Sequence, residues 1–576
     1  MTNSPTIFEV FATVAKHRSR SVALGYKSEE KFKTISYKKL AEQVNRLVTG
    51  LKKLGVTEGT KVAVLSSNQP EVVRMDLALN KMGAIVVPIH LSLSPSLIEY
   101  IIKDSGAEYL AIGAGFEKYQ EIKANVNLRQ VITFKNLDWH EGLVNFWDLL
   151  KEEPDTQEPV HFDFCNLIYT SGTTGNPKGV MLSNDNFLKN ISASQKYVFF
   201  NSKDVALSFL PLSHVLERTA GFYNLLYSGG SIFFAESPKT LIDDIKKVRP
   251  TVLVAVPRIF EKVYDKVMDN MRAEKPWKRK LFFWSLNISR SYLNSINDKD
   301  SPFRPFLCIA HFFADHFVLT KVRKIFGGRL RFVISGGAAL DTSIAKFFEA
   351  IGLKILEGYG LTETSPIIAV NPAHEYRFGT VGKVIFGVDV KIALDKEILV
   401  RGHNVMLGYY NNPEATQEAF TADGWFKTGD LGYLSSDGYL TIIGRKKEMI
   451  VTSTGKNVNP VNIESALQIN KYISQAMVFG DNHKFIRAFV VPDFEQIKIY
   501  AESKGLDLEI FQLVKRPEII ELLKEEINKQ LKDFPSNEQV VDFVLLDREF
   551  SEDREELTPT LKLKRNKILE HFKELL

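Results

Sequence analysis

The chain has 576 residues, of which 44% are hydrophobic, and a formal net charge of +5. Because a single hydrophobic core stops growing at about 250–300 residues, we expect at least two domains. The near balance of 74 basic and 69 acidic residues argues against a nucleic-acid-binding protein. Cys165 and Cys308 lie outside any CxxC or metal-ligand spacing, so we expect two small core residues in a reducing cytoplasm and no disulfide framework.

Neither a leader nor a membrane span is predicted. The first five residues lack a basic segment followed by an apolar run, so no signal peptide is expected. No stretch reaches the roughly 20 apolar residues that a spanning helix needs. The richest run, 306–315, is short and contains His311 and Asp315. These features predict a soluble or peripheral protein.

Short apolar runs alternate with amphipathic stretches through the first half of the chain. Residues 61–66 and 84–88 predict buried strands, and residues 71–82 between them have helical periodicity. The same rhythm returns at 251–256 and 330–335. Strands that alternate with helices predict an α/β architecture with parallel sheets.

The pattern changes after Gly379. Four short apolar runs between residues 388 and 443 predict a β-rich subdomain, and Asp437-Gly438 predicts the turn of a hairpin between the last two. A charged step at Lys446-Lys447 then precedes a smaller α+β segment. We therefore predict an N-terminal domain of residues 1–446 and a C-terminal domain of residues 447–576.

The strongest chemical motif is YTSGTTGNPKG at 169–179. Its glycines let the backbone approach a ligand, and its hydroxyls, backbone N–H groups and Lys178 can donate to an anion. A Walker A loop is excluded, because GxxxxGK[ST] spacing is absent and Gly179 follows Lys178. The motif predicts a phosphate-binding loop of another kind, with candidate residues Thr170, Ser171, Gly172, Thr173, Thr174, Gly175 and Lys178.

Further motifs carry groups suited to a nucleotide. Tyr359 offers a flat face for adenine, and Glu363 offers a carboxylate for Mg²⁺ that phosphate oxygens also bind. Asp430 can accept hydrogen bonds from ribose hydroxyls, to which Arg445 can donate. The motifs in chain order are GGAA at 336–339, EGYGLTETS at 357–365, TGD at 428–430, GRKK at 444–447 and PTLK at 559–562.

These motifs and the loop at 169–179 resemble, in the same order, those of the acyl-adenylate-forming superfamily. That superfamily includes acyl-CoA synthetases, luciferases and peptide-synthetase adenylation domains. The resemblance extends over residues 35–565. It implies an α/β fold in which a large N-terminal domain, with mixed and parallel sheets and a β-rich subdomain, precedes a small mobile α+β domain that turns about a hinge at Lys447.

The resemblance also implies roles for single residues. Lys562 would stabilise the charge that develops when a carboxylate attacks the α-phosphate, with Lys564 as the next candidate. Glu363 and His214 would complete the catalytic group, and Thr173 with Glu363 would hold Mg²⁺. The implied adenine and ribose site contains Gly336, Gly337, Ala338, Glu357, Gly358, Tyr359, Gly360, Thr362, Asp430 and Arg445. The implied coenzyme A loop contains Ser453, Thr454, Gly455 and Lys456.

Residues 423–447 are similar to the fatty-acyl-CoA synthetase signature. Three segments resemble the long-chain branch: residues 209–218 (FLPLSHVLER), residues 557–565 and the insert at about 265–325. The implied activity is a long-chain fatty acid–CoA ligase that uses ATP, Mg²⁺ and coenzyme A to form an acyl-AMP and then an acyl-CoA. Thr454 stands where bacterial relatives often have glycine, which leaves the details of thiol access open.

Other functions stay open at this stage. Within enzymes they are an acyl-ACP synthetase and a medium-chain or aryl acid–CoA ligase. Outside enzymes they are a non-catalytic nucleotide-binding protein and a membrane-remodelling protein. The expected partners are fatty acid, ATP and CoA, with no nucleic acid. Aromatic and basic residues at 275–330 predict peripheral membrane contact. A cytoplasmic, possibly membrane-associated location is expected, and a homodimer is compatible with the sequence.

Overall fold

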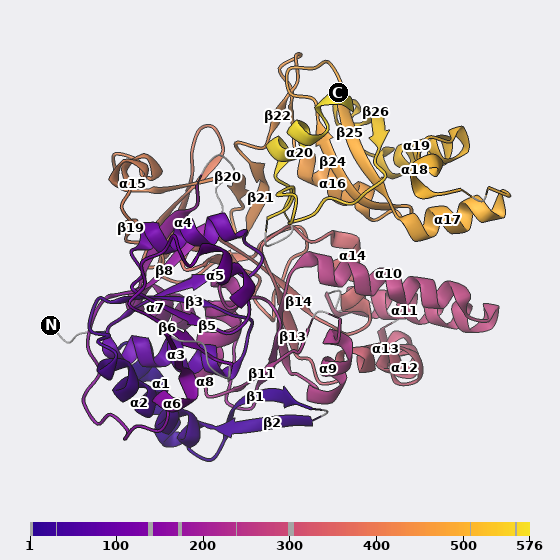
Figure 1. Ribbon diagram of the computed structural model, residues 1–576. Helices are drawn as coiled ribbons and strands as arrows, with labels where there is room; N and C mark the ends of the chain where they lie inside the picture. Colours follow the sequence, from indigo (N-terminus) through magenta and orange to yellow (C-terminus); the bar gives the residue numbers. More distant parts are fainter. Residues whose placement is uncertain are drawn as a thin grey trace. The chain divides into compact units, whose positions relative to one another are not determined.

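The computed structural model describes residues 4–29, 31–135, 142–170, 176–237, 239–297, 304–506, 508–558 and 562–575. The chain forms two compact units (Figure 1). Unit 1 contains residues 1–391, 399–427 and 435–440, and unit 2 contains residues 392–398, 428–434 and 441–576. Unit 2 thus includes two short segments upstream of Lys446, and the boundary after Lys446 stays a prediction.

One sheet of unit 1 has eight strands among the described residues, and its central strands are parallel. The predicted strand–helix–strand unit is confirmed, because helix α3 (Pro70–Met82) connects β3 to β4. Gly83 ends this helix with a positive φ of 67°, which glycine adopts without a steric penalty. The strand order is β19 (Gly408–Tyr409), β9 (Lys178–Ser183), β8 (Phe164–Thr170), β4 (Ile85–Ile89), β3 (Lys61–Leu65), β5 (Tyr109–Ile112), β6 (Gln130–Thr133) and β7 (Leu143–Asn145).

The second sheet of unit 1 has nine described strands, with antiparallel strands at its two edges. Its parallel centre contains the runs predicted at 251–256 and 330–335, which form β12 and β13. The strand order is β16 (Lys383–Val384), β15 (Ile367–Val370), β14 (Ile355–Gly360), β13 (Phe332–Ser335), β12 (Val252–Ala255), β10 (Val205–Ser208), β11 (Ser231–Phe234), β1 (Val22–Ser28) and β2 (Lys31–Ser36).

Helices surround these sheets, and their amphipathic patterns explain which sides are buried. In α2, for example, Leu40, Val44, Leu47 and Leu51 are all buried at helical spacing. The helices of unit 1 also include α1 (Ile7–His17), α2 (Tyr37–Lys53), α4 (Pro95–Ser105), α5 (Phe116–Ile122), α6 (Phe146–Leu149), α7 (Asn184–Ser194), η1 (Glu217–Tyr223), α8 (Asn224–Ser228), α9 (Leu241–Val248), α10 (Pro257–Ala273), α11 (Pro276–Asn297), α12 (Arg304–Ala314), η2 (Asp315–Leu319), α13 (Thr320–Arg323), η3 (Lys324–Phe326), α14 (Thr342–Ala350), η4 (Thr362–Thr364) and α15 (Pro413–Ala419).

The predicted β-rich subdomain forms a four-stranded sheet in the order β17, β18, β20, β21. Gly438 has a φ of 85°, as expected for the predicted Asp-Gly turn between its last two strands. Its strands are β17 (Val388–Ile392), β18 (Glu397–Gly402), β20 (Phe426–Leu434) and β21 (Leu440–Arg445).

Unit 2 is built around a three-stranded sheet in the order β24 (Ile473–Phe479), β25 (Ile486–Pro492), β26 (Val540–Leu545). Successive side chains point to opposite faces, so Ala488 and Val490 join one buried cluster and Phe489 joins another. Helices α16 and α19 bury apolar side chains in the first cluster, and α20 in the second. The remaining elements are β22 (Ile450–Val451), β23 (Asn457–Val458), α16 (Pro460–Gln468), α17 (Phe494–Ser503), α18 (Ile510–Leu513), α19 (Pro517–Leu531), η5 (Ser536–Glu538), α20 (Arg565–His571) and η6 (Lys573–Leu575).

Helices α12, η2, α13 and η3 follow one another without a break, which corrects one prediction. Residues Pro305–Phe326 form a helix of 22 residues with a mean hydropathy of 1.2, long and apolar enough to cross a membrane by length and composition. His311 and Asp315 were expected to interrupt the apolar run. His311 instead stacks on Tyr292 and Asp315 pairs with Arg323, so neither residue ends the helix. Cys308 was also predicted wrongly: it is exposed, whereas Cys165 is buried.

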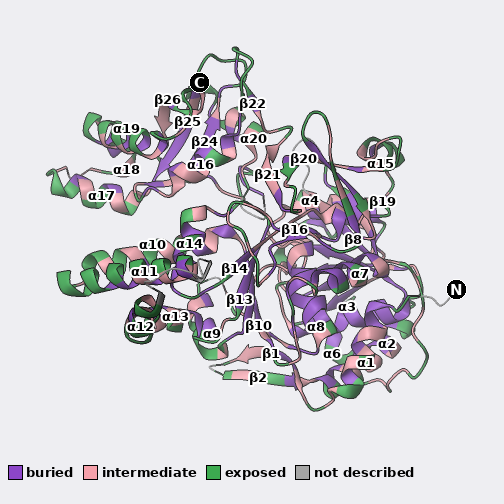
Figure 2. Ribbon diagram, turned by 180° about the vertical axis from the view of Figure 1, so that it is seen from behind, coloured by how far each residue is buried: buried purple, intermediate pink, exposed green. Residues whose placement is uncertain are grey.

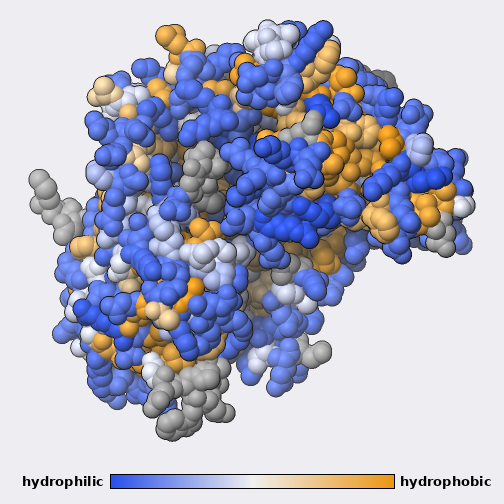
Figure 3. Space-filling model, turned by 45° about the horizontal axis from the view of Figure 1, so that its top comes forward, coloured by the Kyte–Doolittle hydropathy of each residue, from blue (hydrophilic) through white to orange (hydrophobic). Residues whose placement is uncertain are grey.

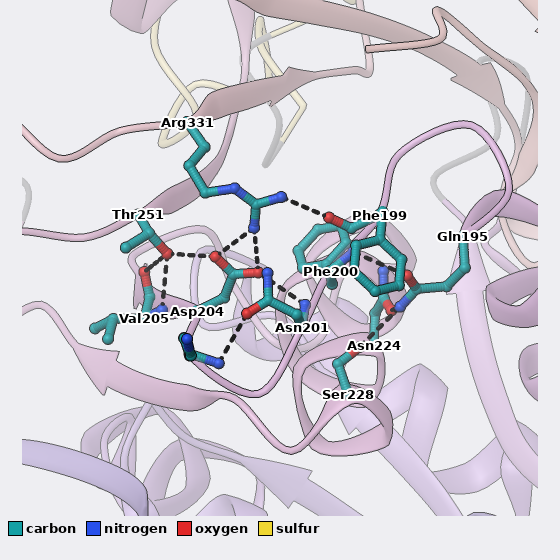
Figure 4. Close-up of polar contacts among 11 residues, drawn as sticks. Gln195, Phe199, Phe200, Asn201, Asp204, Val205, Asn224, Ser228, Thr251 and Arg331 are labelled. Atoms are coloured by element: carbon teal, nitrogen blue, oxygen red, sulfur yellow. Dashed lines mark hydrogen bonds and ion pairs between the residues drawn. The ribbon is translucent and has the colours of Figure 1, made fainter. Parts of the chain in front are cut away.

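A polar cluster ties β10, β12 and β13 together at their amino ends (Figure 4). Asp204, which is 1% exposed, accepts two hydrogen bonds from Nη1 of Arg331, at 2.7 and 2.6 Å. The Thr251 hydroxyl donates to the same carboxylate at 2.7 Å. Each of these residues comes directly before or near the start of a strand, so the cluster fixes where the parallel strands begin.

Replacing Arg331 with methionine should lower the free energy of unfolding of this part of the protein by about 2–3 kcal/mol. The change leaves a buried carboxylate without its cation, and the estimate lies below the roughly 3–5 kcal/mol typical of fully buried pairs because Arg331 is partly exposed. Denaturant titration with intrinsic fluorescence measures the effect. The control is Arg329→Met, an exposed arginine two residues away, which should change stability by less than about 0.5 kcal/mol. Equal effects of the two changes would contradict the prediction.

Candidate active site

The predicted phosphate loop connects two antiparallel strands, β8 and β9, which lie between β4 and the short edge strand β19. Thr170 at the end of β8 is paired with Lys178 at the start of β9. A Walker A loop leads from a strand into a helix, so the topology agrees with the exclusion made from spacing. Five predicted residues, Ser171, Gly172, Thr173, Thr174 and Gly175, lie outside the described residues.

Lys178, Tyr409 and Glu363 come together beside this hairpin. The Lys178 Nζ lies 5.0 Å from the centre of the Tyr409 ring. The Tyr409 hydroxyl donates to Oε1 of Glu363 at 2.9 Å. Burial, and then the Glu363 carboxylate, raise the pKa of Tyr409 above its usual value, so its hydroxyl stays a donor at neutral pH. Tyr409 could not be predicted from the sequence, because it lies beside Lys178 only through the pairing of β19 with β9.

Two glycine-containing segments meet where β13 and β14 end. A Cβ on Gly336 would lie 3.2 Å from Leu216 and 3.6 Å from the Gly358 carbonyl, so the two segments are neighbours. A Cβ on Gly360 would lie 1.6 Å from the Pro366 carbonyl oxygen, which excludes any other residue there without a backbone shift. Gly337 has a φ of 86°. The predicted adenine residues 336–338 and 357–360 are therefore brought together, and their role stays a prediction.

The carboxyl group of Glu357, in the same region, has a raised pKa. The Leu340 N–H donates to its Oε2 at 3.4 Å. Burial raises the pKa of Glu357 to about 7, and Asp341 acts in the same direction. The Glu357 carboxyl can therefore be either ionised or protonated near neutral pH. The ionised form accepts hydrogen bonds from a nucleotide base, and the protonated form can also donate one.

His214 lies in a loop that a residue far away in the sequence holds in place. The Asn68 amide donates to the Leu210 carbonyl at 2.6 Å and accepts from the Leu212 N–H at 2.9 Å. Nδ1 of His214 accepts from the Leu216 N–H at 3.3 Å. Because Leu216 also contacts Gly336, the loop lies beside the predicted adenine segments. The sequence offered no motif for Asn68.

A small cavity adjoins this loop and has a charged wall. Leu212, Ser213, Asp76 and Arg218 line it, together with side chains of β3 and β4. Asp76 and Arg218 form an ion pair and are each 1% exposed, and the Tyr223 hydroxyl donates to Asp76 at 2.9 Å. Two buried charges in such a pair need each other, because either one alone would be costly to desolvate.

Asp430, Arg445 and Lys562 come together within unit 2. Nε of Arg445 lies 3.2 Å from Oδ1 of Asp430, which is 3% exposed. Asp430 and Arg445 also influence the charge of Lys562. Lys562 keeps an exposed surface although many protein atoms surround its amine. Desolvation of the amine, followed by the charge of Arg445, lowers the pKa of Lys562 below that of an ordinary lysine.

The predicted hinge follows a residue that is firmly held. Nζ of Lys446 contacts Asp395 at 2.6 Å and Glu397 at 2.9 Å. The Lys446 N–H donates to the Gly429 carbonyl at 2.9 Å. Lys447 is exposed, and within the described part of the chain its N–H forms no hydrogen bond. The Glu448 and Met449 N–H groups both donate to the Arg445 carbonyl, at 3.0 and 3.1 Å, so Lys447 lies within a turn. The hinge at Lys447 stays a prediction.

The predicted coenzyme A loop connects β22 to β23 and is exposed. Thr452, which precedes it, accepts a hydrogen bond from the Lys456 N–H at 3.2 Å, and the Ser453 N–H donates to the His483 carbonyl at 3.0 Å. Gly455 has a φ of 75°, and a Cβ there would meet no atom within 4 Å. Thr454 and Lys456 are exposed, and the role of this loop in binding coenzyme A stays a prediction.

The described residues do not form a metal cage. No group of three or more His, Cys, Asp or Glu side chains is placed to bind a metal among them. Glu363 is one available carboxylate, and Mg²⁺ commonly uses one or two carboxylates with phosphate oxygens. The donor set therefore fits Mg²⁺ that arrives with a nucleotide.

Comparison with known proteins decides the family. The AMP-binding enzyme family matches residues 11–410, and the AMP-binding enzyme C-terminal domain matches residues 447–576. The chain belongs to the AMP-binding enzyme family. A long-chain-fatty-acid–CoA ligase, FadD15 of Mycobacterium bovis, is 35% identical over 92% of this chain and 90% of its own. Human long-chain-fatty-acid–CoA ligase ACSBG1 is 29% identical over 99% of this chain and 84% of its own.

Solved structures of AMP-binding enzymes confirm the predicted fold class. The anthranilate CoA ligase AuaEII, solved with anthranoyl-AMP, matches with a TM-score of 0.77 and 20% identity over 100% of this chain and 99% of its own. The adenylation domain of a carboxylate reductase from Mycobacterium chelonae matches with a TM-score of 0.79 and 22% identity, over 100% and 91% of the two chains. At these identities the likeness concerns the fold alone.

Proposed function

We propose that this AMP-binding enzyme is a long-chain fatty acid–CoA ligase. The observation that carries the proposal is the match, over nine-tenths of the chain, to a protein named as such a ligase. The charged residues that the reaction needs are all present: Lys178, Glu363, Asp430, Arg445 and Lys562. A non-catalytic relative would have no reason to keep them.

In the first step, a fatty carboxylate attacks the α-phosphate of ATP, the P–O bond to pyrophosphate breaks, and acyl-AMP forms. Two anions must approach each other, so cations are the main requirement. Lys178 would neutralise the departing phosphates, and Lys562 would stabilise the negative charge at the α-phosphate. Asp430 would accept from the ribose hydroxyls, oriented by Arg445 at 3.2 Å.

Mg²⁺ would supply further positive charge to the phosphates. Among the described residues, Glu363 would hold it, and the Tyr409 hydroxyl fixes the orientation of that carboxylate through its 2.9 Å hydrogen bond. In the second step, the coenzyme A thiol attacks the acyl carbonyl and AMP leaves. Residues 453–456 would line the approach of the thiol.

A ligation assay over saturated acids from acetate to C20 tests the substrate class. We expect activity to rise steeply with chain length, because each methylene buried contributes about 0.8 kcal/mol, or about fourfold in kcat/KM. The same assay with acyl carrier protein in place of coenzyme A tests the acyl-ACP alternative. A maximum at C2–C4, or a preference for aryl acids, would overturn the long-chain assignment.

The enzyme is proposed to act in the cytoplasm, in contact with a membrane through residues 275–330. Both cysteines are free, as suits a reducing compartment. The homodimer compatible with the sequence stays a prediction, which light scattering of the purified protein would test.

A further inference from the structure

Helix α12 is exposed along much of its length (Figure 2). On it and on the following turn η2, several of the exposed side chains are large and apolar. Apart from the adjacent pair Phe312 and Phe313, they are spaced by three or four residues, which places them on one side of the helix. The Phe312 ring lies 5.7 Å from Phe313, which stacks on Phe317 at 6.2 Å, so these three rings are in contact. We call this set of side chains the aromatic face; its members, between 51% and 67% exposed, are Phe306, Ile309, Phe312, Phe313 and Phe317.

The other side of the same helical run is anchored in unit 1. Leu319, Val322 and Phe326 belong to its hydrophobic core. Arg323 donates to Asp315 at 2.7 Å and to the Ile351 carbonyl at 2.8 Å, which ties the run to the end of α14. A helix fixed in this way cannot leave the domain to cross a bilayer, although its length of 22 residues would allow it. The exposed side of the helical run can therefore only lie along the surface of a bilayer.

The charged residues in the segment that carries the aromatic face are mostly basic. Between residues 305 and 330 there are four basic residues and one acidic residue, Asp315, which Arg323 neutralises. Lys321, Lys324 and Arg329 are exposed beyond the end of the face. The segment 305–320 has no other charged residue. Exposed aromatic side chains followed by exposed cations match the chemistry of an anionic lipid surface.

We infer that the aromatic face binds the surface of an anionic bilayer, with its rings in the headgroup–acyl boundary. Patches of hydrophobic residues on a mostly hydrophilic surface are visible in Figure 3. A long-chain acid partitions into bilayers, so this contact would place the enzyme beside its substrate. The aromatic face is thus the specific surface for the membrane contact proposed above. Its purpose rests on the proposed ligase activity, whereas the contact itself does not depend on that activity.

Co-sedimentation of the full-length protein with phosphatidylcholine–phosphatidylserine vesicles, without ATP, coenzyme A or fatty acid, tests the inference. The wild type should pellet, and the triple variant Phe312→Ser/Phe313→Ser/Phe317→Ser should lose at least tenfold in partitioning. Phe511→Ser is the matched control, since Phe511 is 53% exposed in unit 2, and it should pellet like the wild type. Lys321→Glu/Lys324→Glu should weaken binding to anionic vesicles more than to pure phosphatidylcholine.

Three results would overturn the inference: a wild type that stays in solution, a triple variant that pellets like it, or a triple variant whose oligomeric state changes without lipid. The last would make a second copy of the chain the occupant of the face. Unchanged melting and unchanged ligation of a water-soluble acid such as octanoate show that the triple variant is folded. If no fatty acid is ligated while pelleting still depends on the face, the proposed function fails and this inference stands.

Discussion

Replacing Lys562 with alanine should lower acyl-adenylate formation by about 10²–10³-fold, the usual cost of removing one preorganised group that stabilises transition-state charge. Lys562 lies with Asp430 and Arg445, and if these two bind the ribose as proposed, its amine would lie near the sugar–phosphate end of the nucleotide. Acid-dependent ATP–pyrophosphate exchange measures this step. Thioester formation from supplied acyl-AMP should largely survive, because the second step has no attack on phosphorus.

The matched control is Lys564→Ala, two residues away. Normal exchange in the Lys562 variant with loss in the Lys564 variant would transfer the role to Lys564. The pH profile adds a second check. Lys562 acts as a cation, so the first step should decline as pH rises through its pKa, and since burial lowers that pKa, the decline should begin below the range of an ordinary lysine. Lys562→Arg should move the decline to higher pH.

Lys447→Pro should abolish thioester formation while acyl-adenylate formation persists. Proline fixes φ near about −65° and restricts the residue before it, here Lys446. Lys446 is held by Asp395, Glu397 and the Gly429 carbonyl. The residues before Lys447 therefore cannot take up the domain rotation in its place. The Lys447 N–H forms no hydrogen bond within the described chain, and proline therefore removes none. Single-turnover assays of the two half-reactions measure the effect.

Lys447→Ala serves as the control and should retain both half-reactions, because the side chain is exposed. The expectation comes from the need to present Lys562 in the first step and the Gly455 loop in the second. In the structure these two have different neighbours: Lys562 lies with Asp430 and Arg445, and the loop is bonded to His483. Equal loss of both half-reactions in a folded Lys447→Pro protein would contradict a pivot at this residue.

The sequence predicted the strands well where apolar runs were short and bounded by polar residues. Residues 61–66 and 84–88 are buried on both faces of a parallel sheet, which requires continuous apolar runs and makes them recognisable. The helix at 305–326 was not predicted, because composition does not show that His311 stacks on Tyr292 and that Asp315 pairs with Arg323. Exposure of Cys308 was missed for a related reason: the sequence does not show which side of α12 is covered by the rest of the protein, and Cys308 is exposed.

At the candidate site, motifs predicted residues that act through their own chemistry and missed those that position others. Lys178, Glu363 and Asp430 stand in recognisable spacings. Tyr409 and Asn68 do not, because their contacts arise from strand pairing and from a loop more than 140 residues away. Such supports depend on tertiary structure, and a single sequence has no local pattern that records them.

The hairpin that carries the phosphate loop also limits which insertions and deletions the enzyme can accept. Lys178 is in register with Thr170, and Val180 with Ile168, so the strand pairing sets the side of the sheet on which each side chain emerges. Since that side alternates with every residue, adding one residue within β9 would turn Lys178 to the opposite side or force β9 out of register with both β8 and β19. Within this family, we therefore expect differences in loop length before Lys178 and not within β9 after it.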